Sequence, residues 1–405
     1  MSLIRSRMPR LAAAAIAVIT FAPGLAAQDL RAAVEAAWQR QPIAQARAAR
    51  ADEFDARRAA AAAMLPGPPV LGVEHETDLV SRNEGLRKFT GEIAVPLWLP
   101  GQQERAQAVV GADRAAYDAA FTLARLALAG EVRDAYWQAR AAETDASLAR
   151  SALEGLLALE ADVARRVKAG ELARVDGNRA SAEAQFQRIA VAEALARSLR
   201  AAETFRALTG FAQLPANDEA RDTTARPGPD THPGTTAAGQ TVEAARARLR
   251  QVSGDTRDAP ELGLGASQSR VDGTRPWEQT LLVRMRIPFG NEQRNRPRIS
   301  AANADLIEAQ SAQGRIAARL TAEMASAERE LATALAALPL AESRAALARD
   351  TQALIARGFA AGEFDLPTRL RAEREFKEAE QGNARALIEA GRANSRLKQA
   401  YGVMP

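Results

Sequence analysis

Apolar side chains recur at intervals of three and four residues along four long stretches of the chain, at about 28–64, 101–210, 291–356 and 363–400. One such series is Leu153, Leu156, Leu159, Val163 and Val167. This spacing places apolar side chains on one face of a helix, and the abundance of Ala, Leu, Arg, Glu and Gln favours helices. As one helix, residues 101–168 would be about 100 Å long, so the rod has to pack lengthwise against other helices, as in a coiled coil.

Two shorter segments, 69–97 and 260–289, instead alternate apolar and polar residues, as from Val283 to Ile287. Each contains two such runs around a polar turn with Gly, which predicts two β-hairpins. Residues 213–240 are rich in Pro, Gly, Thr and Asp. This composition predicts a linker or an exposed non-helical segment.

The two halves of the chain match at a constant offset of 192 residues, which indicates an internal repeat. The matched positions are Val95-Pro96-Leu97 with Ile287-Pro288-Phe289, Arg165 with Arg357, Gly170 with Gly362, and Gly210 with Gly402. Chance similarity between Ala-rich helices is the alternative, but Gly and Pro are not common helix residues. We therefore expect a first repeat at 28–212, a linker at 213–240 and a second repeat at 241–405.

Each repeat supplies one hairpin, so one chain supplies four strands. Four strands are too few for a closed membrane barrel, which needs about eight or more, and lipid does not tolerate an open sheet edge. Either several copies share one barrel, or the hairpins lie in water.

The first 27 residues are typical of a secretory signal. Arg5, Arg7 and Arg10 precede an apolar stretch at 11–25, and small residues offer cleavage after Ala26 or Ala27. An N-terminal membrane anchor is the alternative, but the stretch is shorter than the ~20 residues that a spanning helix needs. We expect no later segment to be long, apolar and uncharged enough to span a membrane as a helix.

Composition excludes several kinds of chemistry. The chain has no Cys and two His, which leaves little for thiolate or imidazole metal sites or for a Ser-His-Asp triad. Aromatic residues make up 4% of the chain, and without residues 1–27 the charge is about +1, so no nucleic-acid partner is expected. Glu74, Glu76 and Asp78 surround His75, but strand alternation turns His75 to the other face. No metal site, cofactor or catalytic residue is predicted.

Taken together, these features resemble the TolC family of outer-membrane efflux proteins over essentially the whole mature chain. The first strand-to-helix junction has Pro96, Gly101 and Arg105, and the second has Pro288, Gly290 and Arg294. Each helix break keeps the family's Gly, and the residues that follow are Ala173 and Asp176 in one half and Asp365 and Thr368 in the other. The short length and compact linker look most like the heavy-metal, CzcC-like branch.

The resemblance implies a mainly α-helical fold with a membrane β portion. Members are homotrimers in the outer membrane of Gram-negative bacteria, in which three subunits share a twelve-stranded barrel. Their helices continue into the periplasm as a hollow α-barrel, which meets a periplasmic membrane-fusion adaptor and an inner-membrane RND-type pump. Such a channel is a passive conduit and catalyses nothing. The expected cargo is divalent metal cations, with drug efflux or type I protein secretion as alternatives. A soluble periplasmic coiled-coil adaptor or scaffold is the alternative of another class.

Three groups of residues carry the expected function. The helix breaks at 167–172 and 359–364 are expected to be periplasmic tips for adaptor docking and gating, although their charges could simply be solvated. The tip residues are Arg165, Lys168, Gly170, Glu171, Arg357, Gly362, Glu363 and Asp365. In a trimer, Glu363 or Asp365 would form an acidic ring that favours cations. The aromatic residues Trp98, Trp277 and Phe289 are expected near outer-membrane lipid at the membrane interfaces, or else in the core near the junctions. Pro96 and Pro288 are expected where strands end.

Overall fold

The computed structural model describes residues 29–405 except 82, 217–218, 220–226 and 290–291. The predicted leader and Gly290 therefore lie outside the described residues. The α-helices are α1 (Leu30–Gln39), α2 (Pro42–Gln45), α3 (Arg47–Ala62), α4 (Gln102–Ala169), α5 (Arg174–Thr209), α6 (Pro233–Gly254), α7 (Glu292–Ala361) and α8 (Leu366–Ala400). The strands are β1 (Val70–Thr77), β2 (Arg87–Pro96), β3 (Glu261–Arg270) and β4 (Glu278–Arg286), and η1 (Pro229–Thr231) is a 3₁₀ turn.

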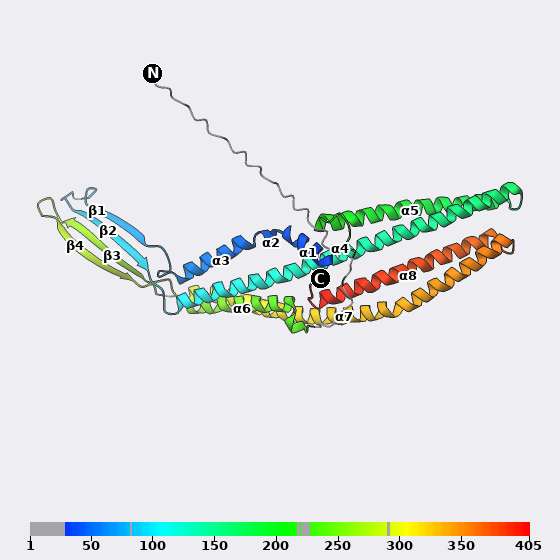
Figure 1. The fold of residues 1–405 in the computed structure, drawn as a ribbon. Coiled ribbons are helices and arrows are strands. Elements are labelled where there is room, and N and C mark those ends of the chain that lie inside the picture. The colour runs from blue at the N-terminus through cyan, green and yellow to red at the C-terminus, as the bar shows by residue number, and fades with distance from the viewer. Residues whose placement is uncertain (1–28, 82, 217–218, 220–226, 290–291) are drawn as a thin grey trace, which may run out of the picture.

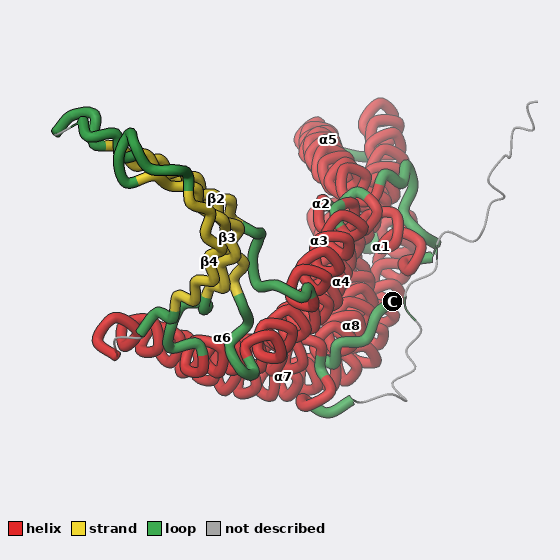
Figure 2. The backbone as a smooth tube through the Cα atoms, turned by 90° about the vertical axis from the view of Figure 1, so that its left-hand side faces the viewer, coloured by secondary structure: helices red, strands yellow, loops and turns green. Residues whose placement is uncertain are grey.

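The molecule is a long rod, with the sheet at one end and two helical hairpins at the other (Figure 1). The prediction of a continuous helix after the first hairpin is confirmed, because α4 has 68 residues and α7 has 70. At 1.5 Å per residue each is roughly 100 Å long. Helix α4 packs against α5 and α6, and α7 packs against α6 and α8. Figure 2 shows the helices side by side in a curved row.

All four strands form a single antiparallel sheet in the order β1-β2-β3-β4. The two predicted hairpins pair with each other through β2 and β3, from Arg87 opposite Arg270 to Pro96 opposite Glu261. Pro96 is therefore the last residue of its strand, where its missing N–H is least harmful. Within the chain, β1 and β4 are the two edges of this sheet.

Glycines end the long helices at equivalent places in the two repeats. Gly170 and Gly362 both have a φ of 82°, and Gly210 and Gly402 have φ values of 79° and 72°. At both tips the Gly N–H and the next N–H bond back to carbonyls in the last turn of the helix, with N–O distances between 2.8 and 3.2 Å. This left-handed conformation suits Gly, because it has no Cβ. The predicted twofold repeat is thus present in the backbone geometry.

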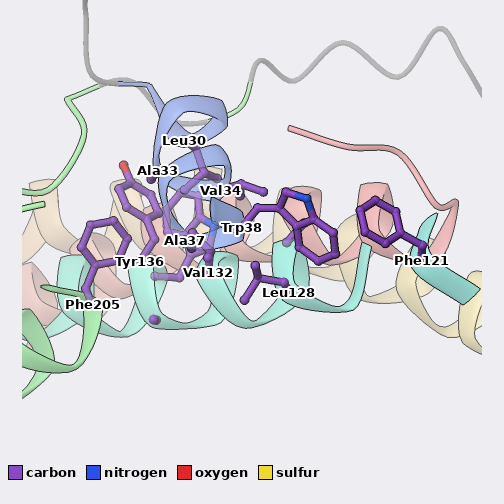
Figure 3. Close-up of a cluster of buried hydrophobic side chains, with 13 residues drawn as sticks. Leu30, Ala33, Val34, Ala37, Trp38, Phe121, Leu128, Val132, Tyr136 and Phe205 are labelled. Atoms are coloured by element: carbon purple, nitrogen blue, oxygen red, sulfur yellow. The ribbon is translucent and has the colours of Figure 1, made fainter. Parts of the chain in front are cut away.

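The largest hydrophobic cluster lies midway along the rod, where α1 crosses α4 (Figure 3). The Trp38 ring meets Phe121 edge-on, with their centroids 4.9 Å apart, and Tyr136 lies between Trp137 and Phe205. Asp29 caps α1 by accepting the N–H of Ala32 at 2.8 Å. This core joins the N-terminal segment to both helices of the first repeat.

A buried ion pair next to this cluster joins the linker to both repeats. Arg133 of α4 and Glu219 of the linker have side chains that are 3% and 4% exposed, and their closest N–O distance is 2.6 Å. The Ser395 hydroxyl of α8 donates to the same carboxylate at 2.6 Å. The Arg133 guanidinium also donates to the carbonyl of Val403 at 2.8 Å. One network therefore holds α4, the linker and the end of α8 together.

The interval 213–240, which the sequence predicts to be a linker or an exposed non-helical segment, contains the start of α6. The helix begins at Pro233 because Pro suits a first helical position and because the ring Nδ1 of His232 accepts the N–H of Gly234 at 2.9 Å. His232 is buried. Burial lowers the pKa of His232, while the Gln399 backbone and the Glu323 carboxylate act in the opposite direction.

One expectation about the helices is wrong. In the part of the chain that the structure describes, α7 is long and apolar enough in one 18-residue window to cross a membrane, although only 6% of that window is buried. The apolar residues of α7 are spread among polar ones, so the sequence shows no uninterrupted apolar run there of the ~20 residues that a spanning helix needs. Exposed Leu340, Leu347 and Leu354 recur every seven residues along α7. A heptad of this kind is typical of a helix that packs lengthwise against another helix.

The Arg133 network predicts a large effect on stability. Replacing Arg133 by Met leaves the Glu219 carboxylate buried without its partner, which should cost about 3–5 kcal/mol of unfolding free energy. Urea denaturation of the purified chain, followed by circular dichroism, measures this loss. Arg246→Met is the matched control, because Arg246 pairs with Glu243 at the exposed surface of α6. That variant should lose less than about 1 kcal/mol. Equal losses in the two variants would contradict the structural role of the buried pair.

Candidate functional site

The β-sheet has one apolar face and one polar face. Strand register places alternate residues on the same side. The large apolar side chains that share one side are Leu71, Val73, Phe89, Ile93, Val95, Leu262, Leu264, Leu281, Val283 and Met285. Most of them are exposed, with Leu71 at 70% and Leu281 at 86%. An exposed apolar surface of this extent is unusual in a protein surrounded by water and is typical of contact with lipid or protein.

Charged residues are paired across strands on the opposite face. Arg284 lies 2.8 Å from Glu92, and Arg286 lies 2.9 Å from Glu261. Nearer the turns, Lys88 lies 3.5 Å from Glu76. Glycines make room for these side chains, because a Cβ on Gly263 would lie 2.0 Å from the Glu92 carboxylate.

Two further carboxylates on this polar face, those of Glu74 and Glu278, make no ion pair among the described residues. The polar face thus carries five carboxylates and three cationic groups. The carboxylates belong to Glu74, Glu76, Glu92, Glu261 and Glu278, and the cationic groups to Lys88, Arg284 and Arg286. The face is therefore net acidic.

Aromatic side chains gather on the apolar face near the turns. The His75 ring stacks on Phe89 with centroids 4.2 Å apart, and Phe89 lies 6.2 Å from Trp277. Of these three rings, only Trp277 was expected from the sequence to be an interfacial aromatic residue. Register also explains why His75 does not join Glu74 and Glu76, because those carboxylates lie on the polar face.

At the foot of the sheet, side chains hold the junction with the helices. The ring N–H of Trp98 donates to the carbonyl of Ala63 at 2.9 Å, which ties the end of β2 to the segment after α3. Phe289 is 93% exposed. Pro288 lies two residues beyond β4, and the side chain of Arg294 is outside the described part of the chain.

Arg105 bridges two helices at this junction. Its Nη2 lies 2.7 Å from Asp255, just beyond the end of α6, and its guanidinium packs against Gly101 and Gly254. Gly101 has a φ of 70° at the start of α4. The sequence analysis noted Gly101 and Arg105 but did not predict Asp255, because 150 residues separate it from Arg105.

The two helix breaks lie side by side at the far end of the rod (Figure 1). The tip charges Arg165, Lys168, Glu171, Arg357, Glu363 and Asp365 are all exposed, as are Gly170 and Gly362. A small hydrophobic cluster beneath them joins the two hairpins through Val163 of α4, Phe359 of α7 and Leu366 of α8.

Arg166 joins the two tips more directly, and the sequence analysis did not single it out. Its Nη1 donates to the carbonyl of Phe359 at 3.2 Å, and its guanidinium lies 5.1 Å from the Phe359 ring centroid. The Nε of Arg166 also lies 3.1 Å from the carboxylate of Asp162. Nothing in the sequence distinguishes Arg166 from neighbouring Arg165, whose side chain is exposed and pairs with Asp162 within its own helix.

The two tips differ in how their second helices begin. Asp365 caps α8 by accepting the N–H of Thr368 at 3.0 Å. The hydroxyl and N–H of Thr368 lower the pKa of Asp365. At the equivalent place in the first repeat, Ala173 has the same extended backbone but no side-chain acceptor. The charge of Asp365 therefore has a local structural role at the start of α8.

No protein-family model matches this chain, and no curated protein matches it either. Solved structures do match it along nearly its whole length. A membrane protein from Pseudomonas aeruginosa is 21% identical, with a TM-score of 0.74 over 92% of this chain and 90% of the other. CusC, described in terms of transmembrane channel formation, is 16% identical, with a TM-score of 0.76 over 93% of each chain. The outer membrane protein VceC from Vibrio cholerae is 16% identical, with a TM-score of 0.74 over 92% and 96%.

These similarities confirm the predicted fold. The chain has the fold of the TolC-like outer-membrane channels, with long paired helices and a small antiparallel sheet. At this level of identity the likeness establishes the fold alone.

The unequal tips give a specific prediction. Ala173→Asn supplies the acceptor that the first repeat lacks and should stabilise the start of α5 by about 1 kcal/mol. Slower amide hydrogen exchange at Val175, at the second position of the helix, together with a higher urea midpoint, would reveal this gain. Ala173→Leu is the control, since Leu provides no acceptor. If the Asn and Leu variants exchange at the same rate, the proposed equivalence of Ala173 and Asp365 is wrong.

Proposed function

We propose that this chain is one subunit of an outer-membrane export channel. Three copies share one twelve-stranded barrel, and their helices enclose a periplasmic tube. The single observation that carries this proposal is the two-faced sheet. Its apolar face is exposed, its opposite face is polar, and both of its edges are open within the subunit.

The geometry of the strands supports closure between copies. Strands β1 and β4 run in opposite directions in an antiparallel sheet with an even number of strands. The β4 edge of one copy can therefore pair with the β1 edge of the next copy in the same antiparallel sense. Three copies supply twelve strands, which removes every edge, as lipid requires.

The helices offer matching surfaces for neighbouring copies. Leu340, Leu347 and Leu354 are exposed along α7, at one lateral side of the subunit. Exposed Phe186 and Ile189 lie on α5, in the other repeat. Packing of α7 against a neighbour's α5 would cover apolar side chains from both copies.

The alternative of another class, a soluble periplasmic adaptor or scaffold, shares the long helices. It gives no reason for an apolar face on an exposed sheet. The first experiment below separates the two classes.

The tips are the proposed docking surface for a periplasmic adaptor linked to an RND-type inner-membrane pump. Exposed charges surround Gly170 and Gly362, and Arg166 locks the two hairpins together beneath them. A docking partner that pulls the hairpins apart would have to break the Arg166 contact. This contact is therefore a specific candidate for the closed state of a gate.

The proposed cargo is divalent metal cations. The acidic surplus of the polar sheet face supports this choice, because that face would line the barrel and a net negative lining favours cations. Drug efflux and type I protein secretion remain the competing cargo classes. The CzcC-like sub-branch is part of this proposal and rests on the short length and compact linker of the chain.

Cross-linking tests the shared barrel, and the absence of native Cys makes it simple. A variant with Gly72→Cys on β1 and Leu282→Cys on β4 is treated in cells with a short bifunctional maleimide. Both positions lie on edge strands, so we expect bands up to a trimer in the outer-membrane fraction and none larger. In the control variant, Thr90→Cys on β2 and Ser267→Cys on β3 are cross-strand partners within one chain. The maleimide should therefore link these two positions to each other, and the control should stay monomeric. Release of the unmodified chain with the periplasm, without cross-linked species, would contradict the proposal and favour the soluble scaffold.

The cargo is tested separately. The double variant Glu74→Gln, Glu278→Gln should lower the preference of the reconstituted channel for cations over anions. In a trimer these substitutions remove six carboxylates from the lining of the barrel. A bilayer reversal potential under a salt gradient measures this preference. Deletion of the gene should also reduce growth on zinc, cobalt or cadmium. A strain that loses only antibiotic tolerance would exclude the metal assignment and leave the barrel proposal intact.

A further inference from the structure

The apolar face of the sheet becomes more polar from the strand ends next to the helices to the turns at the other end. Along β3 this face presents Leu262, Leu264, Ala266, Gln268 and then Arg270. At about 3.4 Å per residue, these eight steps cover roughly 27 Å. That length is close to the ~25 Å apolar band of an outer-membrane barrel. The Arg270 end therefore lies at the level of an interface if the rest of this face lies in lipid.

Two arginines lie directly opposite each other at that end. Arg87 and Arg270 are cross-strand partners, an arrangement that is unfavourable for like charges. Arg87 is already engaged, because its Nη1 bonds to the Thr77 hydroxyl at 2.7 Å and lies 3.4 Å from Asp78. Its charge is thus balanced within the subunit.

The charge of Arg270 has no such partner in the described part of the chain. Among the described residues it has no carboxylate within ion-pair distance, and its Nε is buried without a hydrogen-bond partner. Its guanidinium carbon lies 5.1 Å from the Trp277 ring centroid. A buried donor without an acceptor is costly, so the site lacks an anionic group.

Trp277 lies against the Arg270 guanidinium, and Phe89 and His75 lie two residues nearer the apolar band on the same face. Trp277 lies 6.2 Å from Phe89, which stacks on His75. Such rings favour the boundary between hydrocarbon and headgroups. The anion that Arg270 lacks would therefore lie at headgroup depth, next to acyl chains.

We infer that Arg270, together with Trp277 and Phe89, forms a binding site for a phosphate group of an outer-leaflet glycolipid. The site accepts the phosphate through Arg270 and packs the adjoining sugar and acyl region against Trp277 and Phe89. Arginine suits this role because its planar donors match phosphate oxygens. The site rests on the proposed function, because it requires the apolar face to lie in the outer membrane.

Reconstitution with defined lipids tests the site. The full chain is reconstituted into phosphatidylcholine vesicles that contain either diphosphoryl lipid A or lipid A without phosphates. Flotation reports insertion, and native mass spectrometry after detergent extraction counts the retained lipid A. The wild type should retain the phosphorylated form preferentially, and Arg270→Gln should retain about tenfold less, as expected for one lost charged hydrogen bond.

Two variants separate this site from general charge effects. Arg286→Gln removes the same charge from the opposite face and should retain lipid A like the wild type. Arg270→Lys keeps the charge but loses the planar donors, so it should fall between the wild type and Arg270→Gln. The inference is overturned if the wild type floats with the vesicles but retains no more lipid A than Arg270→Gln, or retains both lipid A forms equally. A wild type that does not float at all overturns the proposed function and this site with it.

Discussion

Backbone hydrogen bonding at the edges of the sheet is the constraint from which the rest of the molecule follows. The outer N–H and C=O groups of β1 and β4 have no strand beside them within the subunit. An apolar environment makes such groups costly, and the exposed apolar face makes water an unfavourable environment for the same sheet. Pairing with further copies, as in the proposed barrel, would satisfy both demands.

Stability within one subunit depends on a different region. Midway along the rod, the Arg133 and Glu219 pair connects α4 and α8 through the linker. Towards the tips, the two helical hairpins share a small apolar cluster and the Arg166 contact. The subunit is therefore strongly joined at its middle and lightly joined at its tips. The proposed opening of the tips would break only these few contacts and leave the middle of the rod intact.

The two repeats have similar backbone geometry at equivalent positions, but their side chains at those positions differ. Gly170 and Gly362 have the same φ, yet Asp365 caps one helix where Ala173 leaves its counterpart uncapped. Backbone geometry is preserved because both tips need the same reversal. Side chains are free to differ because each tip contacts different neighbours. This asymmetry means that equivalent positions in the two repeats need not have equivalent functions.

The sequence by itself determined the elements of this protein. Periods of 3.6 and 2 distinguish helices from strands, and Gly and Pro mark where they end, because these signals depend only on neighbours within a few residues. Pairing of the hairpins through β2 and β3, the Arg105 contact with Asp255 and the Arg133 contact with Glu219 were decided only by the tertiary structure. Each joins residues far apart in the chain, and no local pattern marks one arginine among 54 basic residues as the paired one. The same holds for Arg270. Its Nε is seen to be buried without a hydrogen-bond partner only once the fold places Arg87 and Trp277 beside it.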